Sequence, residues 1–217
     1  MTSGVWRFPG SDDGSGMLLA MLLASAMLAL GLGLVAVAST ERAMAANARM
    51  GAEALYAAEA LGEVVIGELL SDASWTPALA GARHSAFFEA GVPMAPWHAP
   101  VDLAAMTSRQ QAQSDAAWPA GPDRPAWLVF AAGSFASLVS GGPAAPLFVT
   151  AWIADDPADA DGDPNVDANG IVMVRALAIG VGGLQRGLQI ALRRDVVESG
   201  GEAGMPAVRV ESWRELR

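Results

Sequence analysis

A run of 23 residues without a charged side chain, residues 17–39, constrains this chain more than any other feature. At 1.5 Å per residue, a helix of that length is about 35 Å long and covers the roughly 30 Å of hydrocarbon in a bilayer. Small residues recur along it, and in lipid they allow helix backbones to approach one another closely. The run is therefore predicted to be a membrane-spanning helix that packs on other helices. A simple single-pass anchor is the alternative.

The same helix is predicted to continue to Leu70, because no proline interrupts residues 40–70. Ser71, Asp72 and Pro77 are expected to end it. At about 100° per residue, one set of apolar side chains falls within an arc of about 140°: Met44, Ala48, Leu55, Ala58, Leu61, Val65, Ile66 and Leu69. The charged side chains lie on the opposite side, with Glu68 as the exception. This half of the helix is expected to pack against a globular domain.

Beyond residue 126 the hydrophobic period changes to two, which indicates β-strands. The candidate strands are residues 127–131, 147–154, 171–179, 184–193 and 207–213, and a short helix is expected at 101–117. In the fourth strand Leu188, Ile190 and Leu192 alternate with polar residues, so one face should be buried and the other wet. The glycines at 180–183 suit a tight hairpin turn. Together these patterns predict an α+β fold, with about four antiparallel strands packed on the long helix.

An acidic loop, residues 155–170, joins the second and third candidate strands. Oxygen-bearing side chains occupy every second position: Asp159, Asp161, Asp163, Asn165, Asp167 and Asn169. Calcium takes six to eight oxygen ligands, so Asp159, Asp161, Asp163 and Asp167 are candidate calcium ligands. The loop is not an EF-hand, because its twelfth position counted from Asp159 is Gly170. The alternative is a solvated turn in which Asp and Asn serve as turn formers.

Composition excludes several classes of function. The net charge is −10 and all 13 basic residues are arginines, which disfavours nucleic acid as a partner. There is no cysteine for a disulfide or a nucleophile. The two histidines, His84 and His98, lie outside any zinc motif, and no hydrolase or nucleotide-binding motif is present. The sequence therefore predicts a protein that is not an enzyme, and an anchored hydrolase is the weakest alternative.

Three segments resemble bacterial type IV pilins. A hydrophilic leader that ends at Gly16, directly before the apolar helix, looks like the class III signal of prepilins. Residues 39–61 are similar to the segment after the membrane helix in PilX-like minor pilins, which carries an acidic-basic pair (Glu41, Arg42), an Ala-Asn-x-Arg step (residues 46–49) and an Ala-Ala-Glu-Ala step (residues 57–60). Residues 152–180 also resemble a recurring segment of these proteins.

The resemblance implies a pilin-like fold with a leader peptide at residues 1–16, a membrane and amphipathic helix at 17–72, and a globular pilin domain at 73–217. It implies that a prepilin peptidase cleaves between Gly16 and Met17 and that Met17 becomes the methylated amino terminus. The subunit would reside in the bacterial inner membrane as a single-pass protein. It would then join a type IV pilus with the major pilin and other minor pilins, and contribute to assembly and adhesion.

The fifth residue after the expected cleavage site is Met21, where major pilins carry a glutamate. A carboxylate in lipid is retained only when it has a partner, so its absence suits a tip or initiating subunit. Two other roles stay open. One is a minor pseudopilin of a type II secretion system, which shares these features. The other is a membrane-anchored, calcium-dependent binding module that is never cleaved or assembled.

Overall fold

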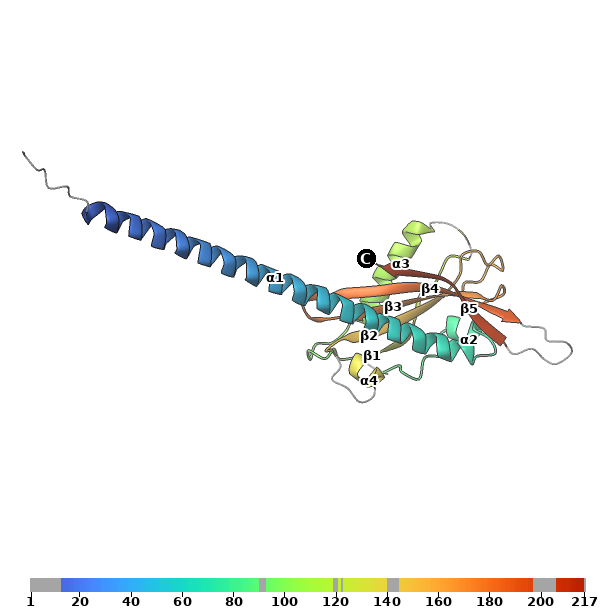
Figure 1. The fold of residues 1–217 in the computed structure, drawn as a ribbon. Helices are drawn as coiled ribbons and strands as arrows, with labels where there is room; N and C mark the ends of the chain where they lie inside the picture. Colours follow the sequence, from blue (N-terminus) through green and yellow to red (C-terminus); the bar gives the residue numbers. More distant parts are fainter. Residues whose placement is uncertain are drawn as a thin grey trace, which may run out of the picture. The chain divides into compact units, whose positions relative to one another are not determined.

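The structure, a computed structural model, describes residues 13–89, 93–118, 121, 123–139, 145–196 and 206–216. Most of the expected leader, residues 1–12, lies outside this described part. The chain forms two compact units, Met1–Arg49 and Met50–Arg217. The helix α1 (Asp13–Leu70) begins in the first unit and ends in the second, as the uninterrupted sequence predicted (Figure 1).

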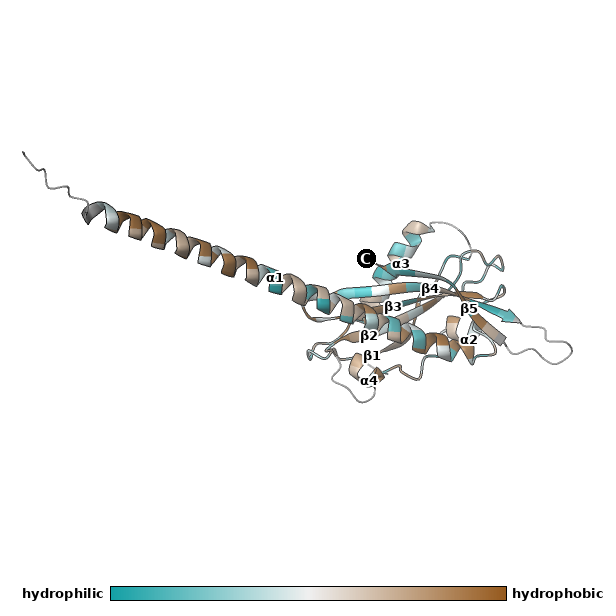
Figure 2. Ribbon diagram, in the orientation of Figure 1, coloured by the Kyte–Doolittle hydropathy of each residue, from teal (hydrophilic) through white to brown (hydrophobic). Residues whose placement is uncertain are grey.

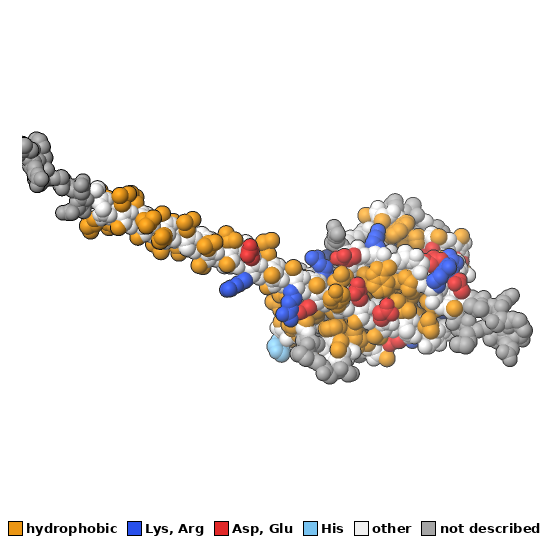
Figure 3. Space-filling model, in the orientation of Figure 1, with side chains coloured by type: hydrophobic (Ala, Val, Ile, Leu, Met, Phe, Trp, Pro, Cys, Tyr) orange, Lys and Arg blue, Asp and Glu red, His pale blue; other side chains and the backbone are white. Residues whose placement is uncertain are grey.

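The first unit consists, in its described part, of the amino-terminal portion of α1. Its large apolar side chains between Met17 and Val37 are 56% to 71% exposed, with no other part of the described chain covering them. Figure 2 shows apolar residues along this portion, and Figure 3 shows the first charged side chains only where it ends. One helix in the described residues is long and apolar enough to cross a membrane, and this is that helix.

The second unit is built on a five-stranded antiparallel sheet, in which all five candidate strands are present and the sheet has one strand more than the four or so expected. Its strands follow in chain order as a meander (Figure 1): β1 (Leu128–Ser134), β2 (Phe148–Asp155), β3 (Ile171–Ile179), β4 (Gln185–Val196) and β5 (Pro206–Leu216). The predicted bounds of β3 agree with the structure, whereas β5 is longer at both ends. The predicted turn between β3 and β4 contains a short 3-10 helix, Val181–Gly183, in which Gly182 and Gly183 have φ values of 74° and 80°.

The carboxy-terminal portion of α1 packs on one face of the sheet. Its fully buried side chains are Ala54, Ala57, Ala58, Leu61, Val65 and Leu69. They share a core with alternate residues of the strands, among them Val149, Ile153 and Leu188. Leu55 and Ile66 are half-buried at the margin of this core. The predicted stripe residues Met44 and Ala48 are exposed, because they belong to the first unit.

The opposite face of the sheet is also covered in part. The helix α3 (Leu103–Ala117), two residues shorter than predicted, starts at an N-cap, Asp102, whose carboxylate accepts a hydrogen bond from the Ala105 amide at 2.8 Å. The Trp152 indole donates to the Thr107 hydroxyl at 2.8 Å and ties β2 to this helix. Every residue of β2 is buried, because α1 covers one face and α3 together with the segment around Ala95 covers the other. Two single-turn helices, α2 (Thr76–Leu79) and α4 (Phe135–Leu138), complete the unit.

Glu68, the exception to the amphipathic pattern of α1, faces the domain, and one of its carboxylate oxygens is hydrogen-bonded there. Its Oε1 accepts hydrogen bonds from the Ser85 hydroxyl at 2.8 Å and from the Ala86 amide at 3.0 Å. Arg83 lies 3.7 Å from Oε2 and also pairs with Asp72 at 3.0 Å. Glu68 thus fastens the segment that runs along the edge of β1, where the Ser85 amide donates to the Phe130 carbonyl.

Replacing Glu68 with alanine is expected to lower the free energy of unfolding by about 2 kcal/mol, because the buried Ser85 hydroxyl and the Ala86 amide both lose their acceptor. Glu63→Ala is the matched control, since Glu63 is exposed on the same helix and should change stability by no more than about 0.5 kcal/mol. Urea unfolding of the full chain in detergent, followed by tryptophan fluorescence, measures both. Equal losses in the two variants would contradict the assigned role of Glu68.

Candidate cation site

The acidic loop between β2 and β3 is shaped by its own aspartates. Asp161 Oδ1 accepts from the Asp163 amide at 2.9 Å, Asp163 Oδ1 from the Asn165 amide at 3.0 Å, and Asp167 Oδ1 from the Gly170 amide at 2.7 Å. Asx turns of this kind are the usual reason for Asp and Asn in loops. Turn formation therefore accounts for part of the regular spacing.

Asp159 has a different role, because it reaches across the loop. Its side chain is buried, and Oδ2 accepts hydrogen bonds from the amides of Ala168 at 2.8 Å and Asn169 at 3.1 Å. Asp156 makes a parallel connection, with Oδ1 accepting from the Asn169 side chain at 2.7 Å. The two ends of the loop are thus held together beside the end of β2.

Three carboxylates meet at this point: Asp155, Asp159 and Asp161. Each offers one oxygen, and the three oxygens lie within 4.8 Å of one another. Asp155 is the last residue of β2 and therefore lies where the strand ends and the loop begins. Like charges this close repel one another unless a proton or a cation intervenes.

Asp155 is the most unusual member of the group. It is 0% exposed, and both of its carboxylate oxygens lack a hydrogen-bond partner in the described part of the chain. The pKa of Asp155 is raised to about 8, chiefly by burial. The nearby carboxylates of Asp159, Asp156 and Asp167 act in the same direction, and the Asp156 backbone amide acts in the opposite one. Without a cation, this carboxyl is therefore largely protonated at neutral pH.

Asp167 is affected in the same direction. Burial raises its pKa, as does the charge of Asp159, whereas the Gly170 amide and the Arg194 guanidinium act in the opposite sense. The whole inner side of the loop is thus short of compensating positive charge.

Of the four predicted calcium ligands, Asp159 and Asp161 belong to the three-carboxylate group. Asp163 and Asp167 lie in the same loop, each with one oxygen bonded to a backbone amide, and calcium binding stays a prediction. The structure adds Asp155, which the sequence pattern had assigned only to the start of the loop. The sequence did contain a signal for Asp155: it is the only charged residue of a strand that otherwise contains apolar residues and one threonine.

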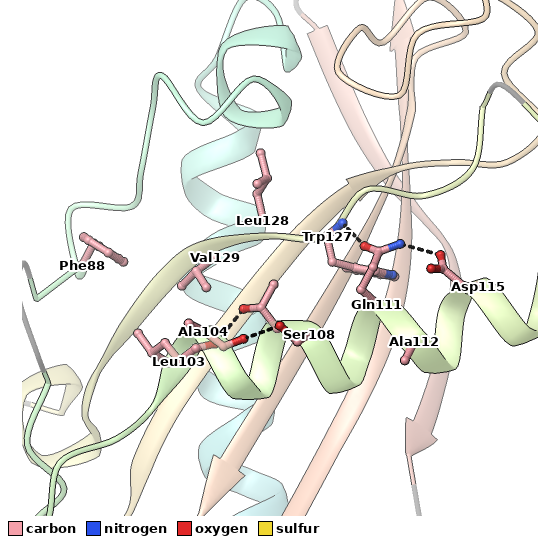
Figure 4. A pocket seen from close by; sticks show the side chains of 11 residues that line it. Phe88, Leu103, Ala104, Ser108, Gln111, Ala112, Asp115, Trp127, Leu128 and Val129 are labelled. Atoms are coloured by element: carbon pink, nitrogen blue, oxygen red, sulfur yellow. Dashed lines mark hydrogen bonds between the residues drawn. The ribbon is translucent and has the colours of Figure 1, made fainter.

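A second feature, a pocket of about 750 Å³, lies between α3 and β1 (Figure 4). Gln111 organises one side of it: its side-chain amide donates to Asp115 at 2.7 Å and its carbonyl accepts from the Trp127 amide at 2.9 Å. Asp115 is the one titratable residue of the lining and already pairs with Arg124 at 3.3 Å. The remaining lining is apolar or weakly polar: Phe88, Leu103, Ala104, Thr107, Ser108, Ala112, Trp127, Leu128 and Val129. This lining offers neither a nucleophile paired with a base nor a set of metal ligands.

The histidines take structural positions. His84 stacks on Phe88 with ring centroids 4.6 Å apart, and its Nδ1 lies 3.1 Å from the Val129 carbonyl. His98 is exposed with a φ of 60°, in a turn where its amide donates to the Ala95 carbonyl. Among the described residues, neither belongs to a group that could hold a metal.

The predicted cleavage site, Gly16 and Met17, lies in the first turns of α1, and both residues are exposed.

A search of protein-family models, of curated proteins and of solved structures finds no match to this chain.

Proposed function

We propose that the chain is a non-enzymatic minor pilin, a structural subunit that moves from the inner membrane into a type IV pilus. The observation that carries this proposal is the division of α1 between two environments. Residues 15–50 are exposed throughout the isolated chain, although those up to residue 39 are almost all apolar or small. From Ala54 to Leu69 the same helix forms the core of the β domain.

A membrane anchor alone needs about 20 residues. Here α1 has 58, and the exposed part continues past the apolar run through Met44, which is 65% exposed, to Met50. An exposed apolar face that continues from the membrane segment past the expected lipid boundary suits contact with other protein surfaces. Neighbouring helices of the same kind would supply it, because Gly31, Gly33 and the surrounding alanines permit close approach of backbones.

Assembly then exchanges one apolar environment for another. In the membrane, lipid covers residues 17–39. In the filament, helices of adjacent subunits take the place of lipid, and the β domain faces outward. The absence of a carboxylate at Met21 removes a group that would need a charged partner in that core, as suits a subunit at the tip.

The decisive experiment is determination of the mature amino terminus. The full chain is expressed with and without a prepilin peptidase, and its amino-terminal peptide is identified by mass spectrometry. We expect a peptide that begins at N-methylated Met17 only when the peptidase is present. Gly16→Asp is the matched variant and should leave the leader in place in both samples.

An unprocessed terminus in every sample would overturn the pilin proposal. If processing occurs, deletion of the gene separates the two filament systems: loss of pili supports a type IV pilus, and loss of protein secretion supports a type II pseudopilus.

A second candidate is an anchored binding module that depends on calcium. The buried, unpaired Asp155 within the three-carboxylate group favours it. An unprocessed terminus together with calcium-dependent stability would make this the better interpretation.

A further inference from the structure

The end of β2 holds a buried carboxylate that lacks any hydrogen-bond partner among the described residues. An isolated charge in a protein interior costs several kcal/mol, so buried carboxylates are normally paired or bind a metal. Asp155 is not exposed to solvent and its two oxygens lack a hydrogen-bond partner among the described residues, although the Asp156 backbone amide is near enough to favour its charge. One of its oxygens lies within 4.8 Å of oxygens of both Asp159 and Asp161. These three oxygens surround a point from which a cation could reach all of them.

We propose that Asp155, Asp159 and Asp161 bind a hard divalent cation, which fastens the acidic loop to the end of β2. This inference is independent of the pilin proposal, because it depends only on residues of the β domain. It also changes the ligand set that the sequence suggested, with Asp155 added and Asp163 and Asp167 left to form turns.

The geometry of the group suits such an ion. Three carboxylates carry enough charge to neutralise a divalent cation, and oxygen is the ligand that calcium and magnesium both prefer. Asp159 is preorganised, because two backbone amides hold its Oδ2. Asp161 is exposed, so water has access to the open side and can complete the coordination. Calcium accepts irregular, partly hydrated geometry more readily than magnesium and is the better fit.

The ion would stabilise more than the loop itself. The Gly170 carbonyl accepts from the Arg194 amide at 2.8 Å, and the Arg194 guanidinium donates to the Ala73 carbonyl at 2.7 Å. The same guanidinium lies over the ring of Trp75, 4.2 Å from its centroid. Holding the loop in place therefore also holds the segment that follows α1.

Thermal unfolding of the full chain in detergent micelles tests the proposal. The protein is stripped with chelator, the chelator is removed, and calcium chloride, magnesium chloride or sodium chloride of equal ionic strength is added. With an ion at about 100 times its Kd, we expect the Tm to rise by roughly 5–10 °C, whereas sodium should leave it nearly unchanged.

Variants locate the site. Asp155→Asn and Asp161→Asn should each lower the affinity for the cation at least about tenfold, as read from the ion concentration at which the Tm rises. Loss of even an outer-shell partner of a metal lowers metal affinity 10–100-fold. Asp163→Asn is the matched control, because it removes the same charge from the same loop and retains an oxygen that can accept from the Asn165 amide. In chelator, Asp155→Asn should leave the Tm close to that of the parent chain, because asparagine matches the aspartate in size and adds no buried charge.

A rise with calcium or magnesium that Asp161→Asn weakens and Asp163→Asn preserves supports the proposal, even if Asp155→Asn fails to fold. The same rise with sodium chloride would overturn it, since general screening of an acidic protein would explain the effect. The absence of any rise, or an equal loss in Asp161→Asn and Asp163→Asn, would overturn it as well.

Discussion

Trp75→Ala is expected to lower the free energy of unfolding by about 3–5 kcal/mol. The Trp75 side chain is fully buried in the core shared by α1 and the sheet. Its indole N–H donates to the Leu69 carbonyl at 2.9 Å, and the Asp72 amide donates to the same carbonyl at 3.2 Å where α1 ends. The Arg194 guanidinium packs on the other side of the ring. Alanine would leave a cavity, a Leu69 carbonyl with one hydrogen bond fewer, and a guanidinium without its aromatic partner.

Two further variants separate these contributions. Trp75→Phe retains most of the ring but not the N–H, and should cost about 1–2 kcal/mol. Trp213→Ala removes a tryptophan that is 41% exposed on β5, so its loss should be clearly smaller than that of Trp75→Ala. Urea unfolding of the full chain in detergent, followed by far-ultraviolet circular dichroism, avoids dependence on tryptophan fluorescence. Similar losses for Trp75→Ala and Trp213→Ala would show that Trp75 does not anchor the end of α1.

The sheet was predictable because its strands are short apolar runs between turn residues and because β4 alternates clearly. In β4, Leu188, Ile190 and Leu192 are fully buried, as predicted, whereas Gln185 is exposed. The buried face of α1 from Leu55 to Leu69 followed from its helical period in the same way. Periodicity identifies a face, however, and not what covers it. Met44 and Ala48 continue the stripe beyond the compact unit and are exposed in the isolated chain.

Features that depend on contacts between distant segments were not predictable. β2 is buried on both faces because α3 and the segment around Ala95 cover one of them, contacts that the sequence of β2 does not encode locally. Trp75 followed a predicted helix end in a region of weak periodicity, where its burial had no local signal. Asp155 becomes part of a site only because the loop returns Asp159 and Asp161 to the end of its strand. The spacing of the aspartates predicted that the loop is acidic, but only the folded structure shows which carboxylates lie together.

Gly62→Leu is expected to lower the free energy of unfolding by about 3 kcal/mol, at the upper end of the usual cost of overpacking a core. A Cβ atom at Gly62 would lie 3.2 Å from Ile190 Cδ1, 3.6 Å from Leu188 Cδ1 and 3.9 Å from Trp213 Cη2. Ile190 and Leu188 are fully buried, so they have little room to move. A leucine would therefore force α1 away from the sheet.

Gly67 provides the matched control on the same helix. A Cβ atom there would meet nothing within 4 Å, so Gly67→Leu adds helix propensity without a clash and should stabilise the domain by up to about 1 kcal/mol. Urea unfolding of both variants in detergent should thus give shifts of opposite sign for the same chemical change five residues apart. Shifts of the same sign would mean that α1 does not pack on β4 through Gly62. Opposite shifts would establish that this glycine lets the carboxy-terminal portion of α1 approach the sheet within the second unit.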